Sequence, residues 1–459
     1  MKQTIVLLGA GGASFTIELL KDLILTESLA GSTLRLVDID QGRLDEALGV
    51  AESYNRESGT AFKIEPYLDR RDALPGAGFI ICAVKVGGYI PLESERKIAE
   101  AHGYYRGIGD RVSCYFGGVG AYHQIKFLED LAHDIEELCP DAWLLQTANP
   151  VFEGTNYLTR YMNVKTVGVC HGHFLAYNIA EIMGLDKDKM SAEIIGINHF
   201  NLLTDFRYEG EDAYPLLDKW IAEKSESYWK SPEFLQSASS YGSAPEYLAP
   251  GAIDFYRIYG LLPIGDAIRA ATPWWHHVDL ATKEKWFGPN GGFDSEVCWP
   301  RYIGEKTVYH DSVKEALTTG KPITELFPLE KSGELHIPFI NSIVTDTYER
   351  FIVNIPNNGC IPGIPDDVMV EIPAVASARG VQGIRMDPLP RRIMDNLLNP
   401  RIRTMNNIHE AYRNGDRSLL VLELMHDYRT KSYEQAKALI DELLAQPWNA
   451  EANVHYRCR

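Results

Sequence analysis

Residues 5–14 read IVLLGAGGAS, and this stretch decides the fold. Four apolar residues lead directly into a glycine-rich turn, and a helical period follows the turn. This order of strand, glycine turn and helix is typical of the first unit of a dinucleotide-binding α/β domain. The first glycine permits the tight turn, the second lets the backbone approach a pyrophosphate, and a small serine replaces the usual third glycine. The candidate cofactor-binding residues of the turn are Gly9, Gly11, Gly12 and Ser14.

Three further loops follow strand candidates and extend this site. Asp38 ends the apolar run 34–37, where it could accept hydrogen bonds from ribose hydroxyls. No arginine follows it immediately to bind a 2′-phosphate, which favours NAD over NADP. Val86 follows the strand candidate 79–83 and is a candidate cofactor contact, and Asn149 follows the run 143–146. Ordinary turn residues remain the alternative interpretation of the last two loops.

Apolar runs and helical periods alternate to about residue 190, which predicts a Rossmann-like parallel sheet of the α/β class. The strand candidates are 5–8, 34–37, 79–83, 143–146 and 166–170, with helices at 17–25, 43–57 and 125–138. The β-rich stretch 193–208 predicts an antiparallel extension of the sheet. The remainder is mixed, with helices expected near 212–230, 313–318, 391–413 and 432–445. We expect an NAD-binding domain at 1–195 and a mixed α+β domain at 196–459 for catalysis, substrate binding and oligomerisation.

Composition and charge exclude several classes of partner. The 459 residues carry a formal net charge of -18, and the basic residues form no runs, so nucleic acid and anionic membrane surfaces are not expected to bind. No run of about 18 apolar residues predicts a membrane span. The first residues lack the pattern of a signal peptide, and the seven cysteines are scattered, odd in number and without zinc-ribbon spacing. We therefore expect a cytoplasmic protein that acts on a small molecule.

Cysteine and histidine residues follow two of the strand candidates. Residues 170–173 read CHGH directly after the run 166–169, and Asn198 and His199 follow another β-like run. One thiolate and several imidazoles near a nicotinamide would suit a divalent transition metal whose open positions a substrate's hydroxyls could fill. A buried free cysteine with surface histidines is the alternative, because the spacing completes no zinc-type pattern.

Taken in order, these motifs resemble glycoside hydrolase family 4 over residues 4 to about 440. The resemblance is carried by the GxGxxS turn, the acidic end of the second strand, a Val-Gly-Gly loop, TANP at 147–150, Cys170-His171, GINH at 196–199 and VNIPNNGCIP at 353–362. It implies a fold like that of lactate and malate dehydrogenases, a requirement for NAD and typically Mn²⁺ or another divalent metal, and a homodimer or homotetramer. The CHGH tetrapeptide resembles the α-galacturonidase group of the family.

The resemblance also implies roles for individual residues. Cys170 and His199 match the family's two metal ligands, and Asn149 matches the asparagine that contacts substrate hydroxyls near the metal. His171 stands at the position associated with protonation of the leaving group. His173 could add a contact to a uronate or a hydroxyl.

The general base and the carboxylate-binding arginine are less closely defined by the sequence. A tyrosine suits the base because the metal's charge could lower its pKa, and the resemblance also implies a tyrosine, in the segment 254–259. Tyr256 is the base that we expect, with Tyr259 and Asp254 as alternatives. A uronate carboxylate would be bound best by a guanidinium. Arg111 is our first candidate for that contact, and Arg106 and Arg269 are the others. Residues 117–123 and 264–269 depart from the patterns of many family members, including those that act on neutral hexoses.

The function predicted from the sequence is hydrolysis of α-galacturonides by oxidation, elimination, addition and reduction, in place of the usual pair of carboxylates. Hydrolysis of α-glucuronides, α-galactosides or α-glucosides within the same family is the alternative. A 2-hydroxy-acid dehydrogenase is another alternative, since it would use the same sheet without a metal. A non-catalytic NAD-binding sensor would need only the glycine-rich turn.

Overall fold

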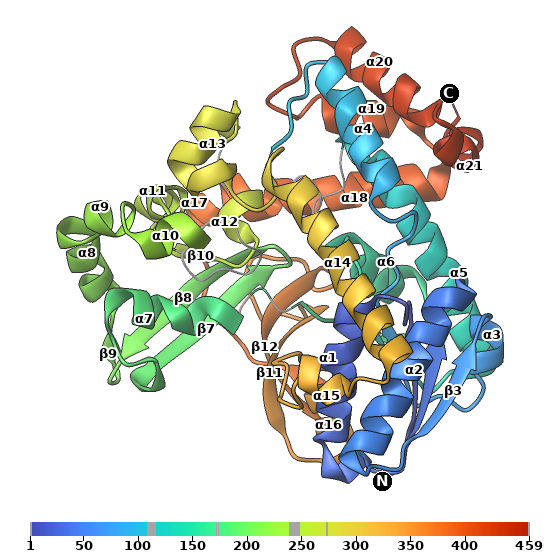
Figure 1. Cartoon of the computed structure of the whole chain (residues 1–459). Coiled ribbons are helices and arrows are strands. Elements are labelled where there is room, and N and C mark those ends of the chain that lie inside the picture. The colour runs from blue at the N-terminus through green and yellow to red at the C-terminus, as the bar shows by residue number, and fades with distance from the viewer. Residues whose placement is uncertain are drawn as a thin grey trace.

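One mixed sheet runs through the molecule and carries both halves of the chain (Figure 1). The computed structural model describes residues 2–107, 116–170, 172, 174–237, 248–271 and 274–457. The strands are β1 Thr4–Leu8, β2 Thr33–Val37, β3 Lys63–Tyr67, β4 Phe79–Cys82, β5 Trp143–Gln146, β6 Lys165–Gly168, β7 Met190–Ile197, β8 Phe200–Tyr208, β9 Glu211–Asp212, β10 Leu262–Ile264, β11 Glu349–Pro356, β12 Met369–Ser377 and β13 Gly380–Gly383.

The N-terminal part of the sheet is parallel and has the strand order of a Rossmann fold. Its order is β3-β2-β1-β4-β5-β6, and each neighbouring pair is parallel. The central strands β1 and β4 are almost entirely buried because helices cover both faces, which explains their nearly unbroken apolar sequence. The α/β class predicted from the sequence is confirmed.

The rest of the sheet is antiparallel and is reached through β11, a strand from late in the chain. Asn354 of β11 lies opposite Gly168 of β6, and β12, β7, β8 and β10 follow in that order. The predicted antiparallel extension at 193–208 is therefore confirmed as β7 and β8. The expected domain boundary between residues 195 and 196 falls inside β7, so the sheet itself crosses it.

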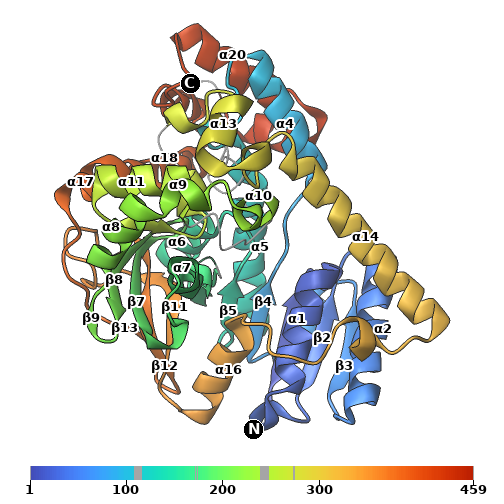
Figure 2. The same cartoon turned by 60° about the vertical axis from the view of Figure 1, so that its left-hand side comes forward.

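Helices flank the sheet on both faces and gather at one end of it (Figure 2). Long helix α14 lies along α1 and α2 of the nucleotide-binding half in both views. The C-terminal helices α18 to α20 join α4 and α5 at the end away from the N-terminus. The helices named below are α1 Ala13–Ile24, α2 Gln41–Ser58, α4 Ile90–Ala101, α5 Tyr122–Leu138, α6 Val151–Tyr161, α8 Tyr214–Glu223, α11 Pro250–Tyr259, α12 Ala267–Ala270, α13 Leu280–Phe287, α14 Cys298–Thr319, α16 His336–Thr345, α18 Asn399–Asn414, α19 Arg417–Leu424 and α20 Tyr433–Leu444.

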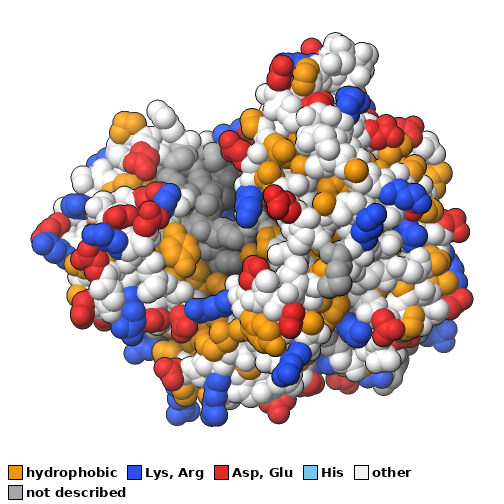
Figure 3. Space-filling view, turned by 90° about the horizontal axis from the view of Figure 1, so that it is seen from below, with side chains coloured by type: hydrophobic (Ala, Val, Ile, Leu, Met, Phe, Trp, Pro, Cys, Tyr) orange, Lys and Arg blue, Asp and Glu red, His pale blue; other side chains and the backbone are white. Residues whose placement is uncertain are grey.

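Charges of both signs are mixed on the face of the molecule that is seen from below. Seen from below, acidic and basic side chains alternate across the face, which is hollowed between two lobes (Figure 3). The described side chains on this face form no continuous basic patch of the kind that binds a phosphate backbone. None of the helices in the described ranges is both long and apolar enough to cross a membrane.

Candidate active site

Three loops meet at the edge where β6 ends and supply the cysteine, histidine and acid of the site. Cys170 follows β6, and His199 lies in the two-residue turn between β7 and β8. Asp266 follows β10, the strand beside β8. The His199 backbone has a φ of 64°, a left-handed conformation that is uncommon for residues other than glycine and is often found at functional sites.

The Cys170 thiol and the His199 imidazole are close enough to bind one metal ion. Cys170 Sγ lies 3.7 Å from His199 Nε2. Two ligands of a tetrahedral ion, with metal–sulfur and metal–nitrogen bonds of about 2.3 and 2.1 Å, would be about 3.6 Å apart. Within the described ranges no group of three or more His, Cys, Asp or Glu side chains is placed to hold a metal. The Cys170 and His199 pair therefore fits a divalent ion whose remaining positions are filled by other ligands, such as substrate hydroxyls.

The surroundings of Cys170 favour a protonated thiol unless a cation is present. Burial raises the pKa of the Cys170 thiol well above its usual value, and the carboxylates of Glu371 and Asp266 raise it further. Hydrogen bonds from the Gly172 amide and the Asn198 side chain offset part of this shift. A bound divalent cation reverses the electrostatic balance and stabilises the thiolate.

A fully buried glutamate, Glu371 of β12, holds the turn that carries His199. Its carboxylate accepts a hydrogen bond of 2.9 Å from Asn198 Nδ2. Burial raises the pKa of Glu371, while hydrogen bonds from Asn198, Asn201 and Asn354 lower it. The same Asn198 therefore links Glu371 to the thiol of Cys170. Glu371 was not predicted from the sequence, because only the pairing of β12 with β11 and β7 brings it to the site.

Asp266 is the second residue of the site that was not predicted from the sequence. Its Oδ2 lies 3.4 Å from His199 Nε2, and its Oδ1 accepts a hydrogen bond from Arg269. Arg269 is itself buried and lies over the ring of Phe293. The Asp266 carboxylate therefore lies beside the Cys170 and His199 pair. An acid directly after a short strand and a glycine was the available signal, and it resembles the placement of Asp38.

Two glycines let the Cys170 loop and the Asp266 loop touch. Gly265 has a φ of 62°, and a Cβ atom on it would lie 2.6 Å from the carbonyl oxygen of Gly172. Backbone atoms at that distance cannot yield without moving a loop. This contact between loops from distant parts of the chain fixes the distance between Cys170 and Asp266.

Gly265→Ala should therefore weaken Mn²⁺ binding and lower kcat/KM by about 100-fold, because a misplacement of about 1 Å at a catalytic centre costs that much. Mn²⁺ titration and steady-state kinetics measure the two effects. Gly260→Ala is the matched control, since Gly260 has a φ of 83° and nothing within 4 Å of an added Cβ. Equal losses in both variants would show that backbone strain alone is responsible and that the contact with Gly172 is unimportant.

The glycine-rich turn has the geometry that a dinucleotide needs. An added Cβ on Gly9, which has a φ of 84°, would meet the backbone of Ala83 at 3.2 Å. Helix α1 begins after Gly12 without a side-chain cap and has no acidic residue in its first turn. The unpaired amides there can bind a phosphate group. The turn therefore fits the pyrophosphate of a dinucleotide.

The other candidate cofactor contacts lie around this turn. Asp38 follows β2, and its Oδ2 accepts a hydrogen bond of 2.8 Å from the amide of Gly11. The loop of Val86 is held by Gln124, whose Oε1 accepts from the Val86 amide at 3.2 Å and whose Nε2 donates to Val84. Ser14 Oγ accepts a hydrogen bond from Nζ of Lys306, a lysine of the C-terminal half.

Asn149 lies between the glycine-rich turn and the metal-binding pair in the order of the sheet. It follows β5, the neighbour of both β4 and β6. Its Oδ1 atom is buried and has no hydrogen-bond partner among the described residues. Buried polar atoms are nearly always paired in native proteins, so this oxygen is available to a ligand hydroxyl.

The structure argues against Tyr256 as the general base. Its hydroxyl donates a hydrogen bond of 2.9 Å to Asp218 of α8, and its ring stacks on Tyr214. Burial and the Asp218 carboxylate raise the pKa of Tyr256 to about 12, the opposite of what a base near neutral pH requires. Helix α11 thus directs this side chain toward α8 instead of toward His199.

The two alternative bases are also engaged elsewhere. Tyr259 packs on Phe255, and burial raises the pKa of its hydroxyl. Asp254 accepts a hydrogen bond of 2.8 Å from Nε2 of the fully buried His276. Neither residue is brought to the Cys170 and His199 pair by a contact that the structure records.

Tyr256→Phe should leave kcat within about twofold of wild type and lower the free energy of unfolding by about 1 kcal/mol, the usual net value of one hydrogen bond. Kinetics with a chromogenic glycoside and urea denaturation test both parts. If the variant instead turned over about a hundredfold more slowly, as expected for a lost general base, with unchanged stability, Tyr256 would be restored as the base.

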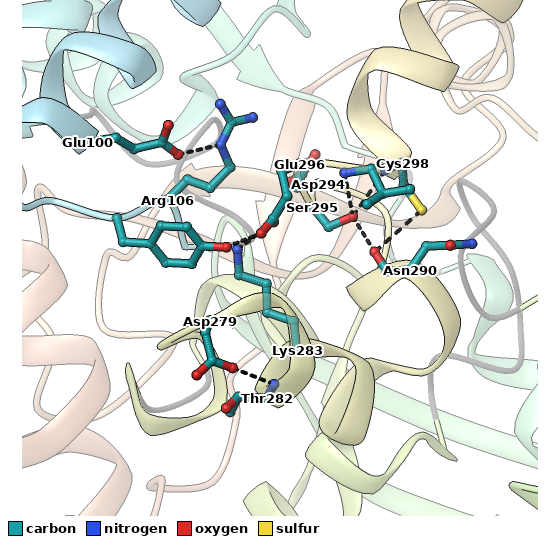
Figure 4. A network of polar contacts seen from close by, with 12 residues as sticks. Glu100, Arg106, Asp279, Thr282, Lys283, Asn290, Asp294, Ser295, Glu296 and Cys298 are labelled. Atoms are coloured by element: carbon teal, nitrogen blue, oxygen red, sulfur yellow. Dashed lines mark hydrogen bonds and ion pairs between the residues drawn. The ribbon is translucent and has the colours of Figure 1, made fainter.

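Of the three candidate arginines, Arg269 alone is seen beside the site. Arg106 is committed to two acids of α4. Its Nε lies 2.7 Å from Glu100 (Figure 4). Its Nη1 lies 3.3 Å from Glu93. Both of its donor edges therefore have carboxylate partners, and Arg106 is not a good candidate for a substrate carboxylate. Arg111, His171 and His173 lie outside the described residues.

A charged cluster beside Arg106 fixes α13 to the chain that follows α4. The fully buried Lys283 donates to Glu296 Oε2 at 2.8 Å, and Tyr105 donates to the other oxygen of the same carboxylate (Figure 4). The Lys283 ammonium also lies 4.2 Å from the centre of the Tyr105 ring. Because each of these charges has a partner within the cluster, we interpret the cluster as structural.

Comparisons with known proteins match almost the whole chain to one family. Residues 4–185 match the model of "Family 4 glycosyl hydrolase", and residues 194–430 match the model of its C-terminal domain. The chain is 28% identical to an alpha-glucosidase of Erwinia rhapontici, covering 98% of this chain and 99% of the relative. It is 26% identical to an alpha-galacturonidase of Thermoanaerobacterium saccharolyticum, covering 96% and 95%.

Solved structures show the same fold. A 6-phospho-alpha-glucosidase from gut microorganisms, solved in complex with NAD and Mn²⁺, has a TM-score of 0.75 at 18% identity and covers 97% of this chain and 98% of its own. A lactate dehydrogenase of Eimeria maxima has a TM-score of 0.50 at 13% identity, covering 93% and 98%. The predicted similarity to lactate dehydrogenase is therefore confirmed at the level of the fold.

Proposed function

The chain belongs to glycosyl hydrolase family 4 and is a glycosidase, and from this premise we propose that it hydrolyses α-galacturonides with NAD and a divalent metal such as Mn²⁺. The observation that carries the proposal is the 3.7 Å separation of Cys170 Sγ and His199 Nε2 at the end of a dinucleotide-binding sheet. A simple dehydrogenase would have no use for this pair.

When bound, NAD accepts and returns a hydride at C3 of the sugar, and the metal draws electron density from the adjacent oxygens, which acidifies the proton on C2. Cys170 and His199 would hold the ion, and the glycine-rich turn with Asp38 would hold the cofactor. Asn149 Oδ1 would accept a hydrogen bond from a substrate hydroxyl, because this buried oxygen has no partner among the described residues.

Asp266 replaces Tyr256 as the base that we propose. Its Oδ2 lies 3.4 Å from His199 Nε2, so the carboxylate is beside the pair that would hold the metal. It would take the proton from C2, after which the leaving group departs from C1 with a proton that His171 would supply. Water then adds at C1 and would give its proton to His171, while Asp266, whose proton exchanges with solvent, would deliver a proton to C2. General acid–base catalysis of this kind contributes about 10²- to 10⁴-fold to a rate.

The uronate part of the proposal is supported by the CHGH motif and by a buried guanidinium near the site. Arg269 lies next to Asp266, where it could also reach a carboxylate on the sugar. Arg111 and His173 remain further candidates for that contact. The enzyme would act on a small-molecule glycoside, and we propose that it is a homodimer or homotetramer.

A neutral α-glucoside is the second candidate substrate. The identity to the alpha-glucosidase is 28%, against 26% to the alpha-galacturonidase. Arg269 already pairs with Asp266, which compensates its charge without a uronate. The choice between the two substrates therefore depends on whether the Arg269 guanidinium, while paired with Asp266, can still bind a carboxylate of the sugar.

An assay on four p-nitrophenyl α-glycosides separates these substrates. Galacturonide, glucuronide, galactoside and glucoside are compared by kcat/KM, with NAD⁺ and Mn²⁺ each omitted in turn. We expect the highest value with the galacturonide and a loss of activity on either omission. A preference for the glucoside would replace the uronate proposal, and full activity without NAD⁺ would contradict the redox route.

A further inference from the structure

Helix α14 brings a lysine from the C-terminal half of the chain to the first turn of α1. Nζ of Lys306 donates a hydrogen bond of 2.8 Å to Oγ of Ser14. Contacts of α14 with both α1 and α2 hold the lysine in place, and the three helices lie together in Figures 1 and 2. The ammonium also lies 5.2 Å from the centre of the Tyr302 ring, one helical turn earlier. A residue of the second half thus reaches the glycine-rich turn.

The charge of Lys306 has no carboxylate partner in the part of the chain that the structure describes. Three acids that neighbour it in sequence or lie on the facing helices are paired with other cations. Glu305 lies 3.7 Å from Arg301, Glu18 lies 2.7 Å from Lys21, and Glu46 lies 3.2 Å from Lys314. Burial lowers the pKa of the Lys306 ammonium, which means that its charge is incompletely solvated.

The turn that Lys306 contacts is itself positive. Helix α1 has no side-chain cap at Gly12 and no acidic residue in its first turn, so its unpaired amides and its dipole favour an anion. The Ser14 hydroxyl, with Lys306 on it, belongs to this same turn. Two independent sources of positive potential therefore converge at the place where a dinucleotide puts its diphosphate.

We propose that Lys306 binds the diphosphate of NAD together with the first turn of α1, so that the cofactor is held by both halves of the chain. The inference rests on the use of NAD proposed above. An ammonium is a suitable point charge for phosphate oxygens, and one of its donors can remain on Ser14 while the others turn to the ligand. Cofactor binding would then fasten α14 to the nucleotide-binding half.

Binding measurements on charge-removing variants test the proposal without reference to catalysis. Lys306→Met keeps the length of the side chain on Tyr302, and Lys306→Gln is the second variant in case the first folds poorly. Lys306→Arg keeps the charge. Lys314→Gln is the matched control on the same helix, because Lys314 pairs with Glu46 and is mostly exposed. Calorimetric titration with NAD, ADP-ribose and adenosine gives the dissociation constants, and circular dichroism checks the fold.

The Met and Gln variants should bind NAD and ADP-ribose about tenfold more weakly or worse, since hydrogen bonds to charged groups are worth that much. Adenosine, which lacks phosphate, should bind as to wild type, and the Arg and Lys314→Gln variants should bind NAD within about threefold of wild type. Unchanged NAD affinity in Lys306→Met or Lys306→Gln would overturn the proposal, as would an equal loss of adenosine affinity. A wild-type protein that binds no NAD would overturn the proposed function itself, and that result is seen before any variant is made.

Discussion

Cys170→Ser should lower kcat by at least about 100-fold and weaken Mn²⁺ binding, while NAD affinity stays near the wild-type value. A serine hydroxyl cannot replace a thiolate as a ligand for a transition metal, and even residues that only support a metal ligand cost about 10- to 100-fold when changed. The glycine-rich turn lies on other strands, so the dinucleotide should still bind. Mn²⁺ titration, NAD titration and kinetics with the preferred glycoside measure the three quantities.

Cys360→Ser is the control for this substitution. Cys360 is also a free, partly exposed cysteine, and its thiol packs against Gly383 of β13. It should keep full activity and metal affinity. Cys170→Ser with undiminished activity would show that the thiol is not a ligand, and loss of NAD affinity in the same variant would point to a disturbed fold instead of a lost ligand.

Asp266→Asn should lower kcat by about 10²- to 10⁴-fold with little change in KM, because the amide keeps the shape of the side chain but cannot accept a proton. Metal affinity should change less than in Cys170→Ser, since we propose only Cys170 and His199 as protein ligands, and the described residues form no group of three that could hold a metal. Initial-rate kinetics at several substrate concentrations separate the effects on kcat and KM.

Asp254→Asn is the matched control, since it removes an acid of α11 that pairs with His276. We expect its kcat to stay within about tenfold of wild type. A larger loss of kcat in Asp254→Asn than in Asp266→Asn would indicate that Asp254 of α11 is the base and that Asp266 is not. An unchanged kcat in Asp266→Asn would show that Asp266 is only a structural partner of Arg269.

The parallel strands could be predicted from the sequence because their signal is local. Helices cover both faces of β1 and β4, so nearly every residue of these strands is apolar. The edge strand β3 was not predicted, because its sequence KIEPY is half exposed and contains a proline that an edge strand tolerates. The position of β11 beside β6 could not be predicted, since it is a pairing of segments far apart in the sequence.

The residues of the candidate site likewise divide into those that could be predicted from the sequence and those that could not. Cys170 and Asn149 could be located because they directly follow strands, where α/β sheets bind ligands. Glu371 and Asp266 could not, since antiparallel pairing and the contact of Gly265 with Gly172 bring them in from distant segments. Glu371 carried no local signal of the site, and the only signal of Asp266 was its place directly after a short strand and a glycine.

Tyr256 shows how a helix can mislead a prediction made from a segment. Neighbouring residues of a helix point in directions about 100° apart, so a correct segment does not fix the correct side chain. Phe255 of α11 is fully buried in the core that includes β7 and β8, whereas Tyr256, the next residue, turns to α8. The apolar periodicity of α11 alone would have shown that Phe255 and Tyr256 face different directions.

The account depends on removal and return of the proton on C2 during cleavage, and product analysis in deuterated water tests this most directly. The preferred glycoside is hydrolysed in D₂O with NAD⁺ and Mn²⁺, and the sugar is examined by NMR. We predict deuterium at C2 of the released sugar. A product that keeps its original hydrogen at C2 would contradict the elimination route and with it the roles given to Cys170, His199 and Asp266.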